Sequence, residues 1–110
     1  MFPPPVPSVQ ASDVAEDALF LDVREPDEWA AGHVEGALHI PIGELIARLP
    51  EIPTDQRVVC MCRVGARSAQ VTAYLVQRGY DMVNLDGGLA AWVAVGRPIV
   101  TETGQPATVL

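Results

Sequence analysis

The fold of this chain is decided by residues 57–68, which read Arg57-Val58-Val59-Cys60-Met61-Cys62-Arg63-Val64-Gly65-Ala66-Arg67-Ser68. Residues 57–61 predict a strand, because β-branched and apolar side chains occupy both of its faces, as in a central strand of a parallel sheet. Gly65 marks a loop, and residues 68–78 predict a helix with Ser68 near its start and Gly79 just beyond its end. Strand, loop and helix in this order form the repeating unit of a parallel α/β sheet.

The same alternation continues on both sides of this segment. Further strands are expected at residues 19–23, 37–40 and 82–85, where short apolar runs are bounded by turn residues. Helices are expected at residues 12–16, 27–31, 42–49 and 89–95. The pattern predicts an α/β domain with a small, mostly parallel central sheet flanked by helices on both faces. The order of the strands does not follow from it.

Length and composition limit the architecture to one domain. The chain has 110 residues, of which 49% are hydrophobic, so it is large enough for one core and too apolar for a disordered chain. We expect a Pro-rich extended lead-in at residues 1–8, the folded domain at residues 9–99 and an irregular C-terminal tail at residues 100–110.

The charge balance limits the partners of this chain. A net charge of −7 opposes binding to nucleic acid or to an anionic membrane surface, but it leaves room for a local site for a small anion. The first residues lack the basic-then-apolar pattern of a secretory signal, and no run reaches the roughly 18 apolar residues of a membrane span. We therefore expect a cytoplasmic protein.

The two cysteines, Cys60 and Cys62, lie two positions apart. A disulfide across that spacing is strained, so free thiols are expected. Two sulfurs with only His33 and His39 elsewhere do not form a recognisable zinc pattern, and no metal or cofactor is expected. Cys60 lies inside the apolar strand, which favours core packing over a role as a resolving thiol.

The loop after the strand has the residues of an anion site. Backbone N–H groups at the start of a helix are unpaired and carry partial positive charge, which lowers the pKa of a thiol placed against them. Arg63 and Arg67 add positive charge, and Gly65 permits a tight turn. Cys62 is therefore either a reactive thiolate or a buried small hydrophobic residue at a strand end.

Three segments together resemble the single-domain rhodaneses over nearly the whole ordered length, from about residue 9 to residue 99. The resemblance is carried by Leu21-Asp22-Val23-Arg24-Glu25 through Glu28-Trp29, Gly32-His33-Val34 and Gly36-Ala37-Leu38-His39-Ile40-Pro41, by the loop of residues 62–68, and by Leu85-Asp86-Gly87-Gly88 with Ala91-Trp92. The pattern departs from the family at His39, where many relatives have Asn, and at Val64, which is bulkier than usual and narrows the pocket mouth.

The resemblance implies a sulfurtransferase with Cys62 as its catalytic nucleophile. The thiolate takes sulfane sulfur from a donor such as thiosulfate, and the resulting persulfide passes it to cyanide or to a thiol. The substrate-binding residues implied are those of the loop: Arg63, Val64, Gly65, Ala66, Arg67 and Ser68. Among them, Arg67 is expected to attract the anionic donor and to stabilise departing sulfite, with Arg63 assisting.

The other motif residues are expected to be supporting ones. Asp22 either orients the loop through its amides or forms a turn at the strand end, and Arg24 is expected in an internal ion pair. His33 is expected to be a hydrogen-bonded turn residue rather than a general base. Trp29 and Trp92 are expected to anchor the core, and Gly87 and Gly88 to serve backbone geometry.

Three other functions remain open at this stage. A cysteine phosphatase has one residue more between its cysteine and arginine than the four residues between Cys62 and Arg67, and Met61 stands where tyrosine phosphatases usually have a histidine. A non-enzymatic binding module of the same fold commonly lacks the cysteine that this chain keeps. A persulfide carrier, loaded by a sulfur-relay protein, has the same sequence features as the thiosulfate enzyme.

Overall fold

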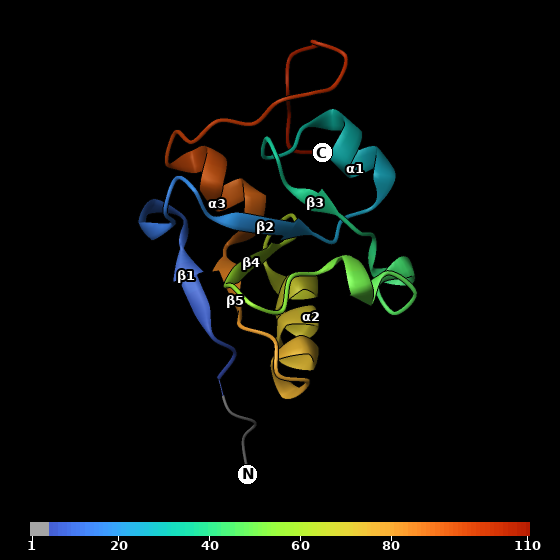
Figure 1. Ribbon diagram of the computed structural model, residues 1–110. Coiled ribbons are helices and arrows are strands. Elements are labelled where there is room, and N and C mark those ends of the chain that lie inside the picture. Colours follow the sequence, from blue (N-terminus) through green and yellow to red (C-terminus); the bar gives the residue numbers. More distant parts are fainter. Residues whose placement is uncertain (1–4) are drawn as a thin grey trace.

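A five-stranded sheet forms the centre of the computed structural model, which describes residues 5–110 (Figure 1). Its strands are β1 (Ser8–Gln10), β2 (Leu19–Asp22), β3 (Leu38–His39), β4 (Val58–Met61) and β5 (Met82–Asp86). They lie in the order β1-β5-β4-β2-β3, and every neighbouring pair is parallel. The predicted strand at residues 57–61 is β4, the central strand. Residues 1–4 of the expected lead-in lie outside the described residues.

Successive side chains of the strands pack into two apolar cores, one on each face of the sheet. Cys60 of β4 belongs to the core beneath α2 (Ala66–Gln77), and Met61 belongs to the core beneath α3 (Gly88–Ala94). In Figure 1, α3 and α2 accordingly lie on opposite sides of the sheet. Because side chains alternate along a strand, a strand that is apolar throughout requires cover on both faces. The predicted α/β architecture is confirmed.

Helix α2 begins two residues earlier than the sequence predicts. Its N-cap is Gly65, in the left-handed region at φ 99°, and it ends at Gln77, before Gly79 at φ 90°. Ser68 therefore lies within the first turn instead of capping the helix, and no side chain caps it. This places the Ser68 amide and hydroxyl groups beside the preceding loop.

Two predicted helices are wrong. Residues 42–49 form the 3₁₀ turn η2 (Ile42–Glu44), a run of turns and the start of η3 (Leu49–Glu51). Pro50 has no N–H to donate and Gly43 disfavours a helix interior, so the backbone bonds are mostly of the i→i−3 type, and Ile46 is 62% exposed. Residues 12–16 likewise contribute only to the three-residue 3₁₀ turn η1 (Ala11–Asp13), which ends where Val14 is extended.

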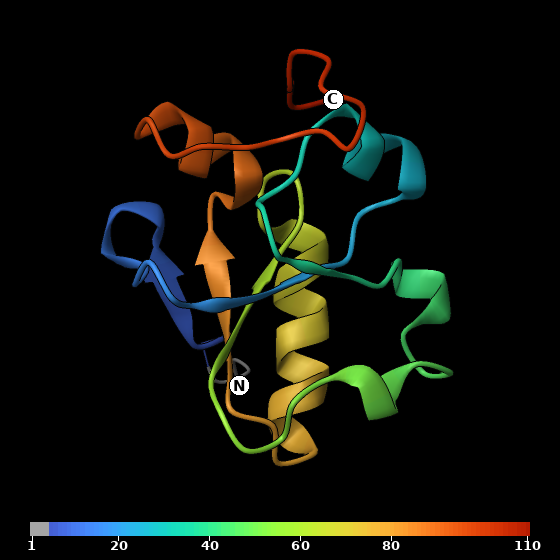
Figure 2. The ribbon, with the colours of Figure 1, turned by 45° about the horizontal axis from the view of Figure 1, so that its top comes forward.

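The tail beyond residue 99 is irregular but packs against the domain. His33 and Val100 form an antiparallel bridge, and the Thr108 N–H donates to the Ala31 carbonyl at 2.8 Å. Figure 2 shows this segment passing beside helix α1 (Pro26–Ala31). A Cβ atom on Gly32 would lie 2.6 Å from the Thr108 oxygen, so glycine is required for this close approach.

A buried ion pair joins the end of β2 to α1. Asp22 and Arg24 are both 0% exposed, with Nη2 of Arg24 2.8 Å from the Asp22 carboxylate. The guanidinium also donates to the carbonyl groups of Gly32 and Glu28. Arg24 is thus an internal ion-pair residue, as predicted. The Asp22 carboxylate accepts from the Arg24 N–H, so it forms the turn at the strand end and does not reach the loop amides.

Replacing this buried arginine is expected to weaken the fold. Arg24→Ala removes the cation and the side-chain donors from a buried carboxylate and two carbonyls, so the free energy of unfolding should fall by about 3–5 kcal/mol. Urea unfolding measures the change. Arg48→Ala, which removes the exposed pairs with Glu44 and Glu51, is the matched control and should cost less than about 1 kcal/mol. Equal losses in the two variants would contradict the structural role of Arg24.

Candidate active site

The loop after β4 is held by the first turn of α3. The Leu89 N–H donates to the Cys62 carbonyl at 2.9 Å, and the Ala90 N–H donates to the Arg63 carbonyl at 3.0 Å. A Cβ atom on Gly88 would lie 2.5 Å from the Cys62 oxygen, so only glycine allows α3 to approach this closely. Gly87 and Gly88 both have positive φ, which confirms their predicted role in backbone geometry.

The Cys62 sulfur lies at the centre of three hydrogen-bond donors. The Gly65 N–H is 3.2 Å from Sγ, and the N–H and hydroxyl of Ser68 are each 3.4 Å away. Burial raises the pKa of this thiol, but the Ser68 hydroxyl and the amides of Ser68, Gly65 and Val64 stabilise the thiolate more, so the pKa of Cys62 falls below its ordinary value. The loop and the first turn of α2 therefore favour a sulfur anion at this position.

Cys60 has the opposite environment. It is 0% exposed in the core beneath α2, and burial raises its pKa to about 12. The predicted packing role of Cys60 is confirmed, and both cysteines are free thiols. Only Cys62 combines a thiol with donors that stabilise its anion.

The back of the loop is fixed by a residue that the sequence did not single out. Asn84 of β5 is buried and donates from Nδ2 to the Gly65 carbonyl at 3.1 Å, which holds the glycine whose N–H faces Cys62. Its Oδ1 has no hydrogen-bond partner. The sequence held one signal for this role. Asn84 is a polar residue within an otherwise apolar strand, and a buried polar side chain needs a hydrogen-bond partner.

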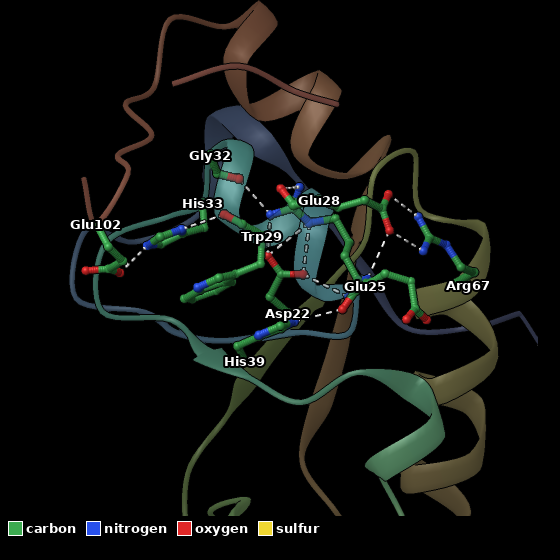
Figure 3. Close-up of polar contacts among 10 residues, drawn as sticks. Asp22, Glu25, Glu28, Trp29, Gly32, His33, His39, Arg67 and Glu102 are labelled. Carbon is green, nitrogen blue, oxygen red and sulfur yellow. Dashed lines mark hydrogen bonds and ion pairs between the residues drawn. The ribbon is translucent and has the colours of Figure 1, made fainter. Parts of the chain in front are cut away.

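Arg67 is directed to a carboxylate rather than to the sulfur. Its Nη1 and Nη2 atoms lie 2.8 and 2.9 Å from the two carboxylate oxygens of Glu28 on α1, and Figure 3 shows the two side chains meeting across the site. The sequence did not predict this partner for Arg67. The available signal was the position of Glu28, an acidic residue in the first turn of a helix that begins at the same edge of the sheet. Arg63, Val64 and Ala66 are exposed on the loop.

Trp29 lies outside both core clusters, so its predicted role as a core anchor is wrong. It is sandwiched between two imidazoles, with ring centroids 3.7 Å from His33 and 4.6 Å from His39 (Figure 3). His33 is hydrogen-bonded to the Trp29 carbonyl and to Glu102, so the predicted hydrogen-bonded role is confirmed. Trp92 is 4% exposed in the core beneath α3, as predicted.

One cavity is lined by residues outside the cysteine loop. It has a volume of about 490 Å³ and is lined in part by Phe20, Trp92 and Arg97. A smaller groove of about 230 Å³ lies beside Arg67, between α2 and η2, with Ile46 and Tyr74 among its lining residues. The Cys62 loop, with donors that converge on a thiol, is the better candidate for chemistry than the larger cavity.

Two kinds of feature are absent from residues 5–110. No group of three histidine, cysteine, aspartate or glutamate side chains is placed to hold a metal ion. None of the helices described has the length and apolar character needed to cross a membrane.

Comparison with known proteins places this chain among its relatives. The sulfurtransferase of Allochromatium vinosum is 49% identical over 90 residues, covering 81% of this chain and 84% of the relative. The putative sulfurtransferase YtwF of Bacillus subtilis is 36% identical over 83 residues, covering 76% of this chain and 81% of the relative. The crystal structure of a rhodanese-related protein from Thermoplasma volcanium is similar with a TM-score of 0.82 and 35% identity, covering 87% of this chain and 99% of that one.

The model of the Rhodanese-like domain family matches residues 9–95. This match includes the sheet apart from Ser8, the three α-helices described above and the whole loop of residues 62–68. The chain therefore belongs to the rhodanese-like domain family.

Proposed function

We propose that this protein is a sulfurtransferase that carries sulfane sulfur as a persulfide on Cys62. The observation that carries the proposal is the set of three donors around the Cys62 sulfur, which favours its anion. The two relatives named as sulfurtransferases support sulfur transfer as the class of activity. The donor, with thiosulfate as its simplest example, and the thiol or cyanide acceptor are part of the proposal.

In the first proposed step the Cys62 thiolate attacks the outer sulfur of thiosulfate. A bond forms between Sγ and that sulfur while the sulfur–sulfur bond of thiosulfate breaks, and its electron pair leaves on sulfite. The nucleophile is already an anion, so no general base is required. The products are the Cys62 persulfide anion and sulfite, with the total charge unchanged.

In the second step an acceptor attacks the terminal sulfur of the persulfide. A cyanide acceptor leaves as thiocyanate, and a thiolate acceptor leaves as a new persulfide. In both cases the bond between Sγ and the terminal sulfur breaks, and its electron pair restores the Cys62 thiolate. The backbone N–H groups of Gly65 and Ser68 stabilise the anion that this step regenerates. They are fixed before the reaction, because they belong to the loop and the first turn of α2.

We assign binding of the anionic donor to the two arginines of the loop. Arg63 is exposed and forms no ion pair among residues 5–110. Arg67 is 38% exposed and can offer its guanidinium to a donor that competes with Glu28. Positive charge at this edge attracts a small anion even though the whole chain carries a net charge of −7.

Sulfur transfer from thiosulfate to cyanide tests the function. The native protein should form thiocyanate, Cys62→Ser should be inactive, and Cys60→Ala should keep most of the activity because Cys60 lies in the core and away from the donors. Circular dichroism of the three proteins controls for folding. Activity in folded Cys62→Ser would contradict the assignment of the nucleophile.

The two remaining alternatives of the family give a different result. A native protein that is inactive in this assay but gains one sulfur atom on Cys62 from a protein persulfide would be a carrier that depends on a partner. Absence of both activities with a Cys62 that still reacts with iodoacetamide would indicate a binding module and would contradict the proposal.

The pH dependence of Cys62 reactivity tests the electrostatic part of the mechanism. The thiolate is the reactive form, so the rate of alkylation by iodoacetamide should rise with pH through a midpoint below that of an ordinary cysteine. Ser68→Ala removes the hydroxyl donor, and the midpoint should move to higher pH while the Ser68 backbone donor remains. An unchanged midpoint in Ser68→Ala would show that the hydroxyl does not stabilise the thiolate.

The role of Arg67 is tested by the charge of the donor. Arg67→Ala should lower kcat/KM for thiosulfate, a dianion, by about tenfold, on the order of 1.4 kcal/mol, and should change kcat/KM for a singly charged organic persulfide much less. Thermal unfolding should shift little, because an arginine at the helix start contributes little to the core. Equal losses with the two donors would contradict a role in binding the anion.

A further inference from the structure

The Glu28 carboxylate is fixed by more than its pair with Arg67. Its Oε1 atom also accepts from the Glu25 N–H at 3.0 Å, as part of a capping box at the start of α1. The Glu28 carbonyl accepts from the buried Arg24 guanidinium. Both ends of this residue are therefore held, and its side chain is only 13% exposed. The carboxylate is the more buried member of the pair, and Arg67, at 38%, is the more exposed one.

The pair changes the electrostatic field at the mouth of the site. Arg67 uses both terminal nitrogens on Glu28, so its charge is balanced by a carboxylate at 2.8 Å. The Arg67 hydrogen bond holds the pKa of Glu28 at about 2, and the carboxylate stays ionised at neutral pH. An incoming anion consequently meets a neutral pair in place of a cation, and it must displace Glu28 to reach the guanidinium.

We propose that Glu28 is a positioning residue that determines donor specificity, because it holds Arg67 in a neutral pair and so lowers the preference of Cys62 for anionic reagents over neutral ones. For natural donors the inference rests on the proposed function and deepens it. The carboxylate reduces capture of small dianions such as thiosulfate and favours donors of lower charge, among them singly charged persulfides. Arg63, exposed and without an ion pair in residues 5–110, leaves a weaker attraction for anions at the loop tip.

Alkylation of Cys62 by two reagents of different charge tests this inference without sulfur transfer. Iodoacetate is an anion and iodoacetamide is neutral, and both react with the thiolate. The ratio of their rate constants cancels any change in the thiolate fraction and reports the field at the sulfur. Glu28→Gln keeps an oxygen that can accept from the Glu25 N–H but removes the charge. We expect the iodoacetate-to-iodoacetamide ratio to rise about fivefold at low salt and less at high salt.

Two control variants separate the pair from the net charge. Glu25→Gln removes one negative charge three residues away, from a side chain that forms no ion pair in residues 5–110, and should change the ratio less than about twofold. In an Arg67→Ala background, Glu28→Gln should change the iodoacetate-to-iodoacetamide ratio by less than about twofold, because the guanidinium that Glu28→Gln would release is absent.

The outcomes are distinct. A ratio in Glu28→Gln within twofold of the native value would overturn the inference, as would an equal rise in Glu25→Gln or a rise that persists without Arg67. Because alkylation does not need a persulfide, these results decide the role of Glu28 even if the protein transfers no sulfur from thiosulfate. If it does transfer sulfur, Glu28→Gln should raise kcat/KM for thiosulfate, a dianion, relative to kcat/KM for a singly charged persulfide by a similar factor.

Discussion

Two backbone hydrogen bonds, from the first turn of α3 to the carbonyl groups of Cys62 and Arg63, fix the loop on which the rest of the site depends. They require α3 to touch the loop backbone, which Gly88 alone permits because a side chain there would meet the Cys62 oxygen. With these carbonyls occupied, the loop turns through Gly65 into α2 and presents its N–H groups to the sulfur. The Gly87-Gly88 segment, although it lies about 25 positions later in the chain, thus fixes the backbone at Cys62.

The electrostatics of the site are local, and they differ from those of the whole chain. The protein carries a net charge of −7, yet the Cys62 sulfur accepts from the N–H groups of Gly65 and Ser68, because a parallel sheet gathers helix N-termini at the carboxyl ends of its strands. Glu28 belongs to the same edge for the same reason. A carboxylate in the first turn of α1 is stabilised by the helix dipole and by Arg67, and it counterbalances the arginine that the loop provides.

The sequence predicts local elements well and contacts between distant residues poorly. The strand ending at Met61 and the helix after Gly65 were predictable, since their apolar and glycine patterns have few other solutions. The spacing of the apolar residues in 42–49 was misleading. It matches a helix, but Gly43 and Pro50 disfavour one, and the segment forms 3₁₀ turns. The donors around the Cys62 sulfur were predictable from the glycine loop and the helix start that follow it. The pairing of Glu28 with Arg67 was not, because the two residues are 39 positions apart and only the fold brings their helices together.

The persulfide is the species on which the whole account depends, and mass spectrometry detects it directly. After treatment of the native protein with thiosulfate in the absence of an acceptor, the account predicts that the peptide containing Cys62 gains the mass of one sulfur atom, and that cyanide removes it. Cys60 should stay unmodified, because it is buried and its pKa is raised to about 12. A native protein whose Cys62 peptide stays unchanged with thiosulfate and with an organic persulfide, while iodoacetamide still alkylates it, would contradict the account.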